Sequence, residues 1–205
     1  LFTNAAAKAN LQYATEAAKI LGIGADADWM NVATNIPILK MPARPGAADG
    51  TDGITGEHST YKGEGIKQAD VNLLAYPLKE ITDTKQIKKD LDYYSARVPD
   101  EGTPAMTQAI FTLLYARIGD SEKAFHFFKD AYVPNLNPPF NVIAETKGGT
   151  NPYFATGAGG ILQSILNGFG GQFLNAWFLN KYGVESTAII TSDVETNSTL
   201  NDMYI

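Results

Sequence analysis

Apolar residues recur at helical spacing along this chain, in segments that come in pairs, and this recurrence limits the folds available to it. In residues 4–21 the apolar positions step by four and three residues, the period of a helix with one buried face. Similar steps recur in residues 83–98 and 103–131. The pairs share no fixed residue period. The pattern predicts an all-α array of helical hairpins, arranged as a solenoid or a toroid.

Residues that cap or stop helices mark the ends of several segments. Thr3 or Asn4 can cap the first helix, and Gly22 can end it. Asp83 or Thr84 can open the helix of residues 83–98. Thr103-Pro104 places a cap before a proline in the first helical turn, and Asp120 or Ser121 can open the helix that follows. Residues 103–131 therefore predict an antiparallel helical hairpin with a very short turn.

Two irregular stretches interrupt the helices. Residues 38–65 are rich in proline and glycine, and loops of this length in compact domains are usually functional or mobile. Pro134, Pro138 and Pro139 predict an extended connection after the second hairpin.

Lys67 and Gln68 stand where the first irregular stretch ends. The apolar run of residues 66–76 predicts a helix, whose first turn could point both side chains at one ligand. An ordinary solvated first turn is the alternative, and the residues alone favour it.

Glu145 is the one carboxylate of a glycine-rich, largely apolar stretch, residues 141–171. Glycines before a helix can form a phosphate-binding loop, but Leu162 stands where the third glycine of a dinucleotide motif belongs, and no Gly-Lys-Ser/Thr follows. A nucleotide site is therefore disfavoured. Sequence physics alone favours a structural interpretation, in which the glycines let a helix pack tightly and Glu145 is a capped surface acid.

Charge and composition exclude several classes of function. The net charge of -6 leaves no basic surface for nucleic acid or for an anionic membrane. The chain contains no cysteine, and its two histidines, His58 and His126, are too few for a transition-metal site. We therefore expect no metal and no cofactor. No apolar run is long enough to span a membrane, and the opening LFTNAAAKAN suggests an excised piece of a longer protein.

The last part of the chain has a less regular pattern. Phe173, Trp177 and Phe178 predict one more helix, and residues 186–191 predict a short strand near the C-terminus. Asn197 opens a glycosylation sequon, a triplet that is common by chance.

Four segments, taken in order, resemble glycoside hydrolase family 65, which includes trehalases, kojibiose hydrolases and disaccharide phosphorylases. They are LFTNAAAKANLQYATEAAKILG, IKQADVNLLAYPL, EGTPAMTQAIFTLLYARIGDSEKAFHFF and AETKGGTNPYFATGAGGILQSILNGFGG. The resemblance implies an (α/α)6 barrel, of which residues 1–171 are the C-terminal half. Residues 172–205 are then a trailing helix and tail that could lead towards a β-sandwich domain. The family's general-acid glutamate is expected before the Phe2-Thr3-Asn4 motif, outside this chain.

The resemblance also implies roles for individual residues. Glu145 matches the general base of the family's inverting hydrolases, and the GTPAMTQ segment lacks the serine cluster with which its phosphorylases hold phosphate. Lys67 and Gln68 are implied to bind glucose hydroxyls, whereas His58 and Tyr61 are candidate contacts at the pocket mouth. Thr156-Gly157 matches a dipeptide that is expected to shape the wall beside the base.

The leading hypothesis is inverting hydrolysis of an α-glucosidic bond in a disaccharide or glucosylated glycan. A phosphate-dependent phosphorylase of the same family is one alternative, and a non-catalytic, glycan-binding helical fragment is another. We expect the chain to be inactive alone and to need the missing N-terminal part of the same protein as its partner, with neither nucleic acid nor membrane involved. A secreted or periplasmic location is slightly favoured over a cytoplasmic one.

Overall fold

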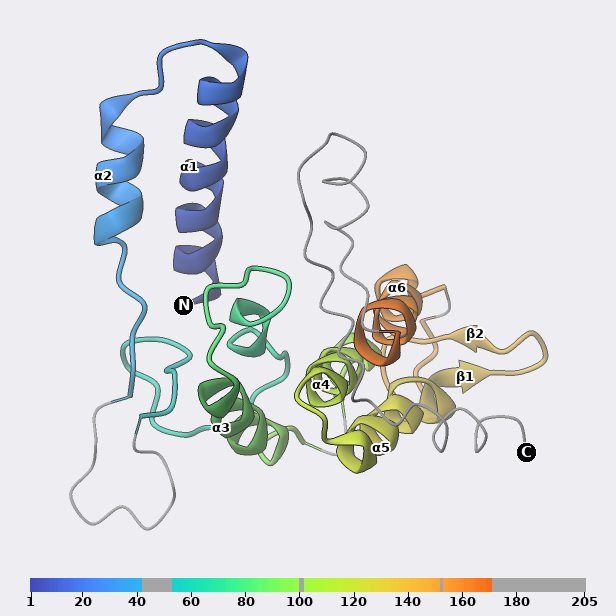
Figure 1. Cartoon of the computed structure of the whole chain (residues 1–205). Coiled ribbons are helices and arrows are strands. Elements are labelled where there is room, and N and C mark those ends of the chain that lie inside the picture. Colours follow the sequence, from blue (N-terminus) through green and yellow to red (C-terminus); the bar gives the residue numbers. More distant parts are fainter. Residues whose placement is uncertain (42–52, 100–101, 152, 171–205) are drawn as a thin grey trace. The chain divides into compact units, whose positions relative to one another are not determined.

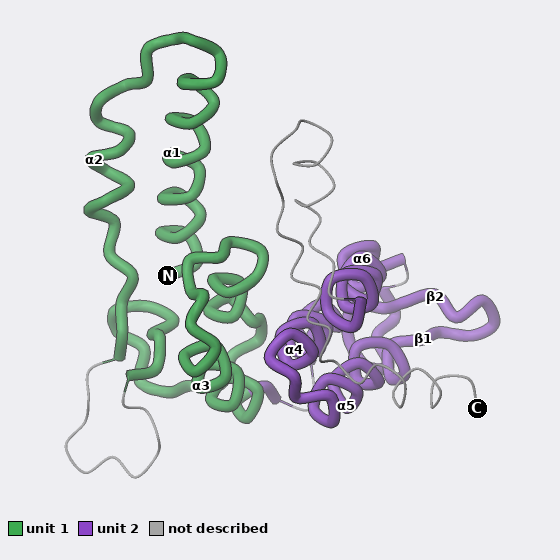
Figure 2. The backbone as a smooth tube through the Cα atoms, in the orientation of Figure 1, with its two compact units in different colours: residues 1–97 green, residues 98–205 purple. Residues whose placement is uncertain are grey.

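A computed structural model describes residues 1–41, 53–99, 102–151 and 153–170. The chain forms two compact units, residues 1–97 and 98–205 (Figure 2). The described residues are mostly helical, with six α-helices and one ribbon of two short strands (Figure 1), which confirms the expected helical class. The helix predicted around Trp177, the strand at residues 186–191 and the Asn197 sequon all lie outside the described residues.

Unit 1 begins with a helical hairpin. Helix α1 (Phe2–Leu21) and helix α2 (Ala27–Asn35) pack side by side (Figure 1). Gly22 ends α1 in the left-handed region at φ 68°, as predicted. The predicted cap at Thr3 or Asn4 is wrong, because both residues lie inside the helix and its N-cap is Leu1, which makes no side-chain cap bond.

Two segments of the long irregular stretch, residues 38–65, pair with each other. Lys40 and Thr55 form an antiparallel bridge, and the Met41 N–H donates to the Ile54 carbonyl over 2.8 Å. Helix α3 (Thr84–Ser95) follows and begins at Asp83, whose carboxylate accepts from two backbone N–H groups of the first turn. This cap was predicted.

The helix predicted to start near Lys67 and Gln68 is wrong. Both residues lie in a bend, and the segment contains only the 3-10 turn η1 (Asn72–Leu74). The Ile66 N–H donates to the Arg97 carbonyl over 3.0 Å, so its partner is 31 residues away rather than on a helical turn. Tertiary contacts, not helical periodicity, place these side chains.

Unit 2 contains the predicted second hairpin, α4 (Ala105–Arg117) and α5 (Ser121–Tyr132), with Asp120 capping α5. Thr103 does not cap α4, because its hydroxyl donates to the Pro99 carbonyl and the N-cap is Pro104.

The connection after α5 is not simply extended, as the prolines had predicted. It is a 3-10 turn, η2 (Val133–Asn135), followed by strands β1 (Leu136–Asn137) and β2 (Val142–Ile143), which pair antiparallel. The tip of this ribbon, residues 138–141, is exposed.

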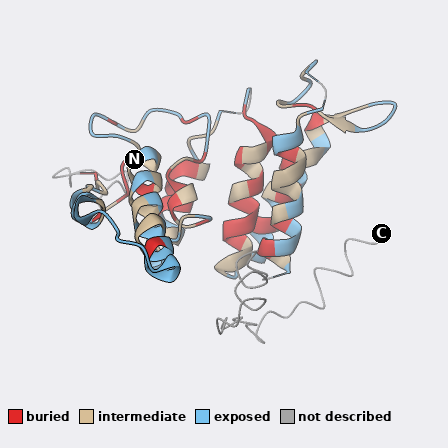
Figure 3. Cartoon of the chain, turned by 90° about the horizontal axis from the view of Figure 1, so that it is seen from above, coloured by how far each residue is buried: buried red, intermediate tan, exposed pale blue. Residues whose placement is uncertain are grey.

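The glycine-rich stretch forms helix α6 (Ala155–Gln163), which continues as the π-helix η3 (Ser164–Phe169) and packs against α4. A Cβ at Gly160 would lie 2.9 Å from the Cβ of Ala109, and one at Gly168 would lie 3.0 Å from the Cα of Leu113. These glycines confirm the tight packing that the sequence predicted. In unit 2 the buried residues gather where the helices face one another (Figure 3), whereas unit 1 also buries residues of its irregular segments, among them Ile54, Tyr61 and Tyr76.

Candidate functional site

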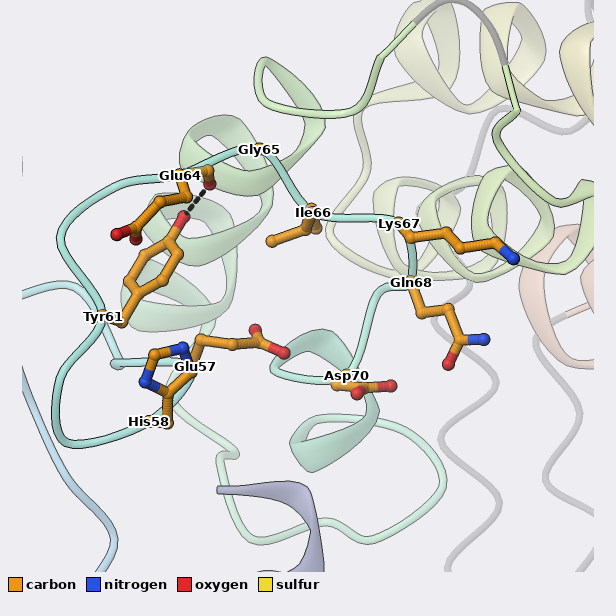
Figure 4. Close-up of a pocket in the computed structure, with 9 residues that line it drawn as sticks. All are labelled: Glu57, His58, Tyr61, Glu64, Gly65, Ile66, Lys67, Gln68 and Asp70. Carbon is orange, nitrogen blue, oxygen red and sulfur yellow. Dashed lines mark hydrogen bonds between the residues drawn. The ribbon is translucent and has the colours of Figure 1, made fainter.

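Unit 1 contains a pocket of about 560 Å³ next to the end of the long loop (Figure 4). All four residues of unit 1 that the resemblance had marked as candidate sugar contacts line it. The complete lining is Glu57, His58, Tyr61, Glu64, Gly65, Ile66, Lys67, Gln68 and Asp70. The pocket therefore gathers three acids, one lysine, one amide and two rings, although the residues come from a loop and a bend rather than from helix faces.

His58 and Tyr61 form one wall. Their rings meet edge to face with centroids 5.7 Å apart. The Tyr61 ring also contacts the ring of Tyr94 in α3, with centroids 5.9 Å apart. Tyr61 is buried, its hydroxyl donates to the Glu64 carbonyl over 2.6 Å, and burial raises the pKa of this hydroxyl. His58 is exposed, with Nδ1 3.0 Å from the Thr60 hydroxyl. Tyr61 is thus a fixed wall, whereas His58 can adjust to a ligand.

Lys67 and Gln68 lie across the pocket from these rings. Both side chains are exposed and extend away from His58 and Tyr61 in Figure 4. The buried residues Ile66 and Ala69 flank them and fix their backbone. The lysine ammonium and the amide can donate to sugar oxygens, and the amide oxygen can also accept.

Glu57 also lines this pocket, and it was not among the residues singled out from the sequence. Its Oε2 is buried and has no hydrogen-bond partner among the described residues. Burial, and then the neighbouring charge of Asp70, raise the pKa of the Glu57 carboxyl to about 7. Because Glu57 follows a glycine in an irregular segment, periodicity gave no signal for it. The only sequence signal was an acid between Ile54 and Tyr61, both of which are buried.

Glu64 contrasts with Glu57 in the same pocket. Its side chain is exposed and accepts from the Lys62 N–H over 2.8 Å, and this hydrogen bond lowers the pKa of the Glu64 carboxyl. The surroundings therefore raise the pKa of Glu57 and lower the pKa of Glu64, although both residues belong to one loop.

Thr55 attaches the pocket loop, which carries Glu57 and His58, to helix α3. Its N–H and hydroxyl both donate to the Asp90 carboxylate, over 2.9 and 2.8 Å, and its carbonyl accepts from the Tyr94 hydroxyl over 2.7 Å. Asp90 is only 2% exposed, and burial raises the pKa of its carboxyl. The polar groups of Thr55 are thus satisfied inside the protein, which holds the pocket loop in place.

Glu145 belongs to unit 2 and is half-buried. Its carbonyl accepts from the N–H of Ala105, the first residue of α4, over 2.9 Å, and Thr146 bridges to Pro104 beside it. A Cβ at Gly157 of α6 would lie 3.1 Å from the Ala105 Cβ. The backbone of Glu145 is therefore fixed to the start of α4, and α6 packs against that same point.

Among the described residues, no group of three or more histidines, aspartates or glutamates lies where it could hold a metal ion. No helix in these parts of the chain is both long and apolar enough to cross a membrane.

Comparison with known families assigns the chain to one class of enzymes. Residues 53–145 match the model of the glycosyl hydrolase family 65 central catalytic domain. The chain belongs to this family, as the sequence motifs had indicated.

Curated relatives extend the match beyond these residues. The chain is 72% identical over 170 residues to a kojibiose hydrolase of Mucilaginibacter mallensis, which covers 83% of this chain and 24% of that protein. It is 56% identical over 175 residues to a kojibiose hydrolase of Flavobacterium johnsoniae, covering 85% and 24%. It is 37% identical over 186 residues to a periplasmic/secreted acid trehalase of Candida glabrata, covering 83% and 14%. The chain thus spans about a quarter of the length of the kojibiose hydrolases it matches.

Proposed function

We propose that the protein containing this chain hydrolyses α-glucosidic bonds in a disaccharide or a glucosylated glycan. The observation that carries the proposal is the 72% identity to a kojibiose hydrolase over most of the chain. Hydrolysis is favoured over phosphorolysis because the relatives described above are named as hydrolases or trehalases. Kojibiose is accordingly the first substrate to test, and trehalose is the second.

In the proposed mechanism, Glu145 is the general base of an inverting reaction. It removes a proton from a water molecule that attacks the anomeric carbon, while a general-acid glutamate upstream of Leu1 protonates the departing oxygen. In inverting enzymes the two carboxyl groups stand about 6.5–9.5 Å apart to leave room for this water. The hydrogen bond from the Ala105 N–H to the Glu145 carbonyl supports this role, because it fixes the backbone of the base.

The pocket of unit 1 is proposed to bind the glucosyl unit. Lys67 and Gln68 would hydrogen-bond its hydroxyls, and Tyr61 and His58 would bound the space around it. The helical hairpins are proposed to belong to an (α/α)6 barrel that the rest of the protein completes. A secreted or periplasmic location is proposed on the name of the yeast trehalase.

Replacing Glu145 by Gln in the full-length protein tests this mechanism. Glutamine keeps the shape of the side chain but cannot accept a proton, so we expect kcat on the cleaved disaccharide to fall by about 10² to 10⁴-fold. Proton NMR of the first-formed product should show β-glucose released by the wild-type protein. Glu122→Gln is the matched control, because Glu122 is an exposed acid in the first turn of α5 in the same unit.

Two other results would lead to the alternatives. Cleavage that requires inorganic phosphate and yields β-glucose 1-phosphate would identify a phosphorylase. Binding of glucosides without any turnover would identify a non-catalytic glycan-binding protein. Near wild-type turnover by Glu145→Gln would remove Glu145 from the mechanism while leaving the hydrolase assignment in place.

A further inference from the structure

The pocket of unit 1 carries more acid than the proposed sugar contacts account for. Glu57, Glu64 and Asp70 line it together with the single lysine Lys67. Such a surface disfavours an anionic ligand such as a sugar phosphate and suits an uncharged, hydroxyl-rich ligand.

The three acids are not equivalent. Glu64 is exposed and already accepts from the Lys62 N–H over 2.8 Å. Glu57 is half-buried, and its Oε2 has no hydrogen-bond partner in the described part of the chain. In Figure 4 the Glu57 carboxyl is directed towards the side of the pocket where Asp70 lies. A buried oxygen without a donor, close to a second acid, disfavours the ionised form.

The charged groups around Glu57 support the same conclusion. Burial has the largest effect on its pKa, and the neighbouring Asp70 raises it further. Glu57 in turn helps to raise the pKa of the hydroxyls of Tyr61 and Tyr94. The resulting pKa of about 7 leaves Glu57 mostly protonated below neutral pH.

A protonated Glu57 has two places for its proton. On Oε2 the proton would be a buried donor, and no acceptor for it is found among the described residues. On Oε1 the proton can be donated to a ligand in the pocket that Glu57 lines. The second arrangement avoids a buried unsatisfied hydroxyl and is therefore favoured.

We propose that Glu57 is a further sugar-contacting residue, which donates a hydrogen bond to a sugar oxygen as an uncharged carboxylic acid. The inference rests on the proposed function, because it takes the ligand of this pocket to be a glucosyl unit. It adds a donor to those of Lys67 and Gln68, and it makes sugar affinity depend on one proton.

Direct binding of D-glucose to the full-length protein, measured by calorimetry at pH 6 and pH 8, tests this proposal. If only the protonated form binds, a pKa of about 7 predicts that the dissociation constant rises about tenfold between these pH values. Glu57→Gln replaces the neutral acid by an isosteric donor and acceptor, so we expect it to bind at pH 8 nearly as at pH 6. Glu57→Ala should bind about tenfold or more weakly at pH 6, through loss of the hydrogen bond.

Glu64→Gln is the matched control, because Glu64 lines the same pocket but its carboxylate is exposed. It should keep the tenfold change with pH. His58, Lys67 and Asp70 remain in every variant, so the difference between the wild-type and Glu57→Gln profiles belongs to Glu57.

Three results would overturn the proposal: no glucose binding by the wild-type protein at pH 6, wild-type affinity in Glu57→Ala, or an unchanged pH profile in Glu57→Gln. If Glu57→Ala does not fold, the pH profile of Glu57→Gln still decides the test. The readout does not need turnover. If the protein shows Glu57-dependent binding but cleaves no α-glucoside, the proposed function is refuted and this inference stands. If it cleaves α-glucosides but its glucose binding does not depend on Glu57, this inference is refuted and the proposed function stands.

Discussion

Gly159 and Gly160 are neighbours in α6, yet the same substitution should have opposite effects at the two positions. A Cβ at Gly160 would lie 2.9 Å from the Cβ of Ala109 on α4, whereas a Cβ at Gly159 would meet nothing within 4 Å. Gly159→Ala should therefore gain helix propensity alone, about 0.5–1 kcal/mol of stability. Gly160→Ala gains the same propensity but has to separate two helices.

The cost at Gly160 follows from the contact distance. Two carbon atoms prefer about 3.5–4.0 Å, so α6 would have to move away from α4 by roughly 0.6 Å or more. Such a movement would stretch the hydrogen bond that the Ser164 hydroxyl donates to the Ala109 carbonyl, which is 2.8 Å long. Overpacking of this kind costs about 1–3 kcal/mol. After the propensity gain, we expect Gly160→Ala to destabilise this helix pair by up to about 2.5 kcal/mol.

Hydrogen exchange followed by mass spectrometry of the full-length protein provides the assay, because it reports the opening free energy of peptides from α4 and α6 separately from the other segments. A cost of 1.4 kcal/mol corresponds to a tenfold faster exchange through opening. Ala109→Gly combined with Gly160→Ala removes the opposing Cβ, so the double variant should be more stable than the sum of the two single effects by about 1–3 kcal/mol.

The packing explanation would be refuted by equal effects of Gly159→Ala and Gly160→Ala. Additive effects in the double variant would refute it independently, because the two Cβ atoms would then not interact.

Two further predictions concern acids of unit 1. Because the pKa of Glu57 rises from 4.5 to about 7 on folding, the folded state binds more protons in that window, and stability should fall as pH rises from about 4.5 to 7. Because Glu57 is partly exposed, we expect the free energy of unfolding to fall by only about 1 kcal/mol. Scanning calorimetry at pH 5 and pH 7.5 should detect this loss in the wild-type protein, and the loss should be smaller in Glu57→Gln. Asp90→Ala should cost about 2–4 kcal/mol in denaturant unfolding, because it leaves the N–H of Thr55 without its buried acceptor. Asp92→Ala should cost less than about 1 kcal/mol, since Asp92 is paired with Lys88 at the surface, and equal losses in both variants would contradict this assignment.

Helical periodicity predicted α1, α3, α4 and α5, whereas only some of the predicted caps are present. Asp83 and Asp120 cap the helices that they were expected to open, and Gly22 ends α1. The helix predicted to start near Lys67 is absent, because the Ile66 N–H donates to the carbonyl of Arg97, a residue far away in the sequence. Propensity cannot foresee such a contact.

The candidate site shows the same limit. The family motifs marked Lys67 and Gln68, and the structure places both at the pocket, but no motif marked Glu57. Asp90 did have a signal, because it falls between Ile87 and Leu91 within a predicted apolar stripe, where an acid has to be paired. That its partner is Thr55, 35 residues away, could only come from the structure.

The ribbon that precedes Glu145 offers a place to modify the protein close to its proposed base. Strands β1 and β2 are paired up to Asn137 and Val142, and the exposed tip between them includes Phe140, which is 86% exposed. Because Glu145 is fixed by α4 rather than by this tip, a reporter peptide or fluorophore inserted there would sit a few residues from the base without displacing it. We therefore expect the tip to tolerate an inserted reporter, through which substrate binding could be followed optically.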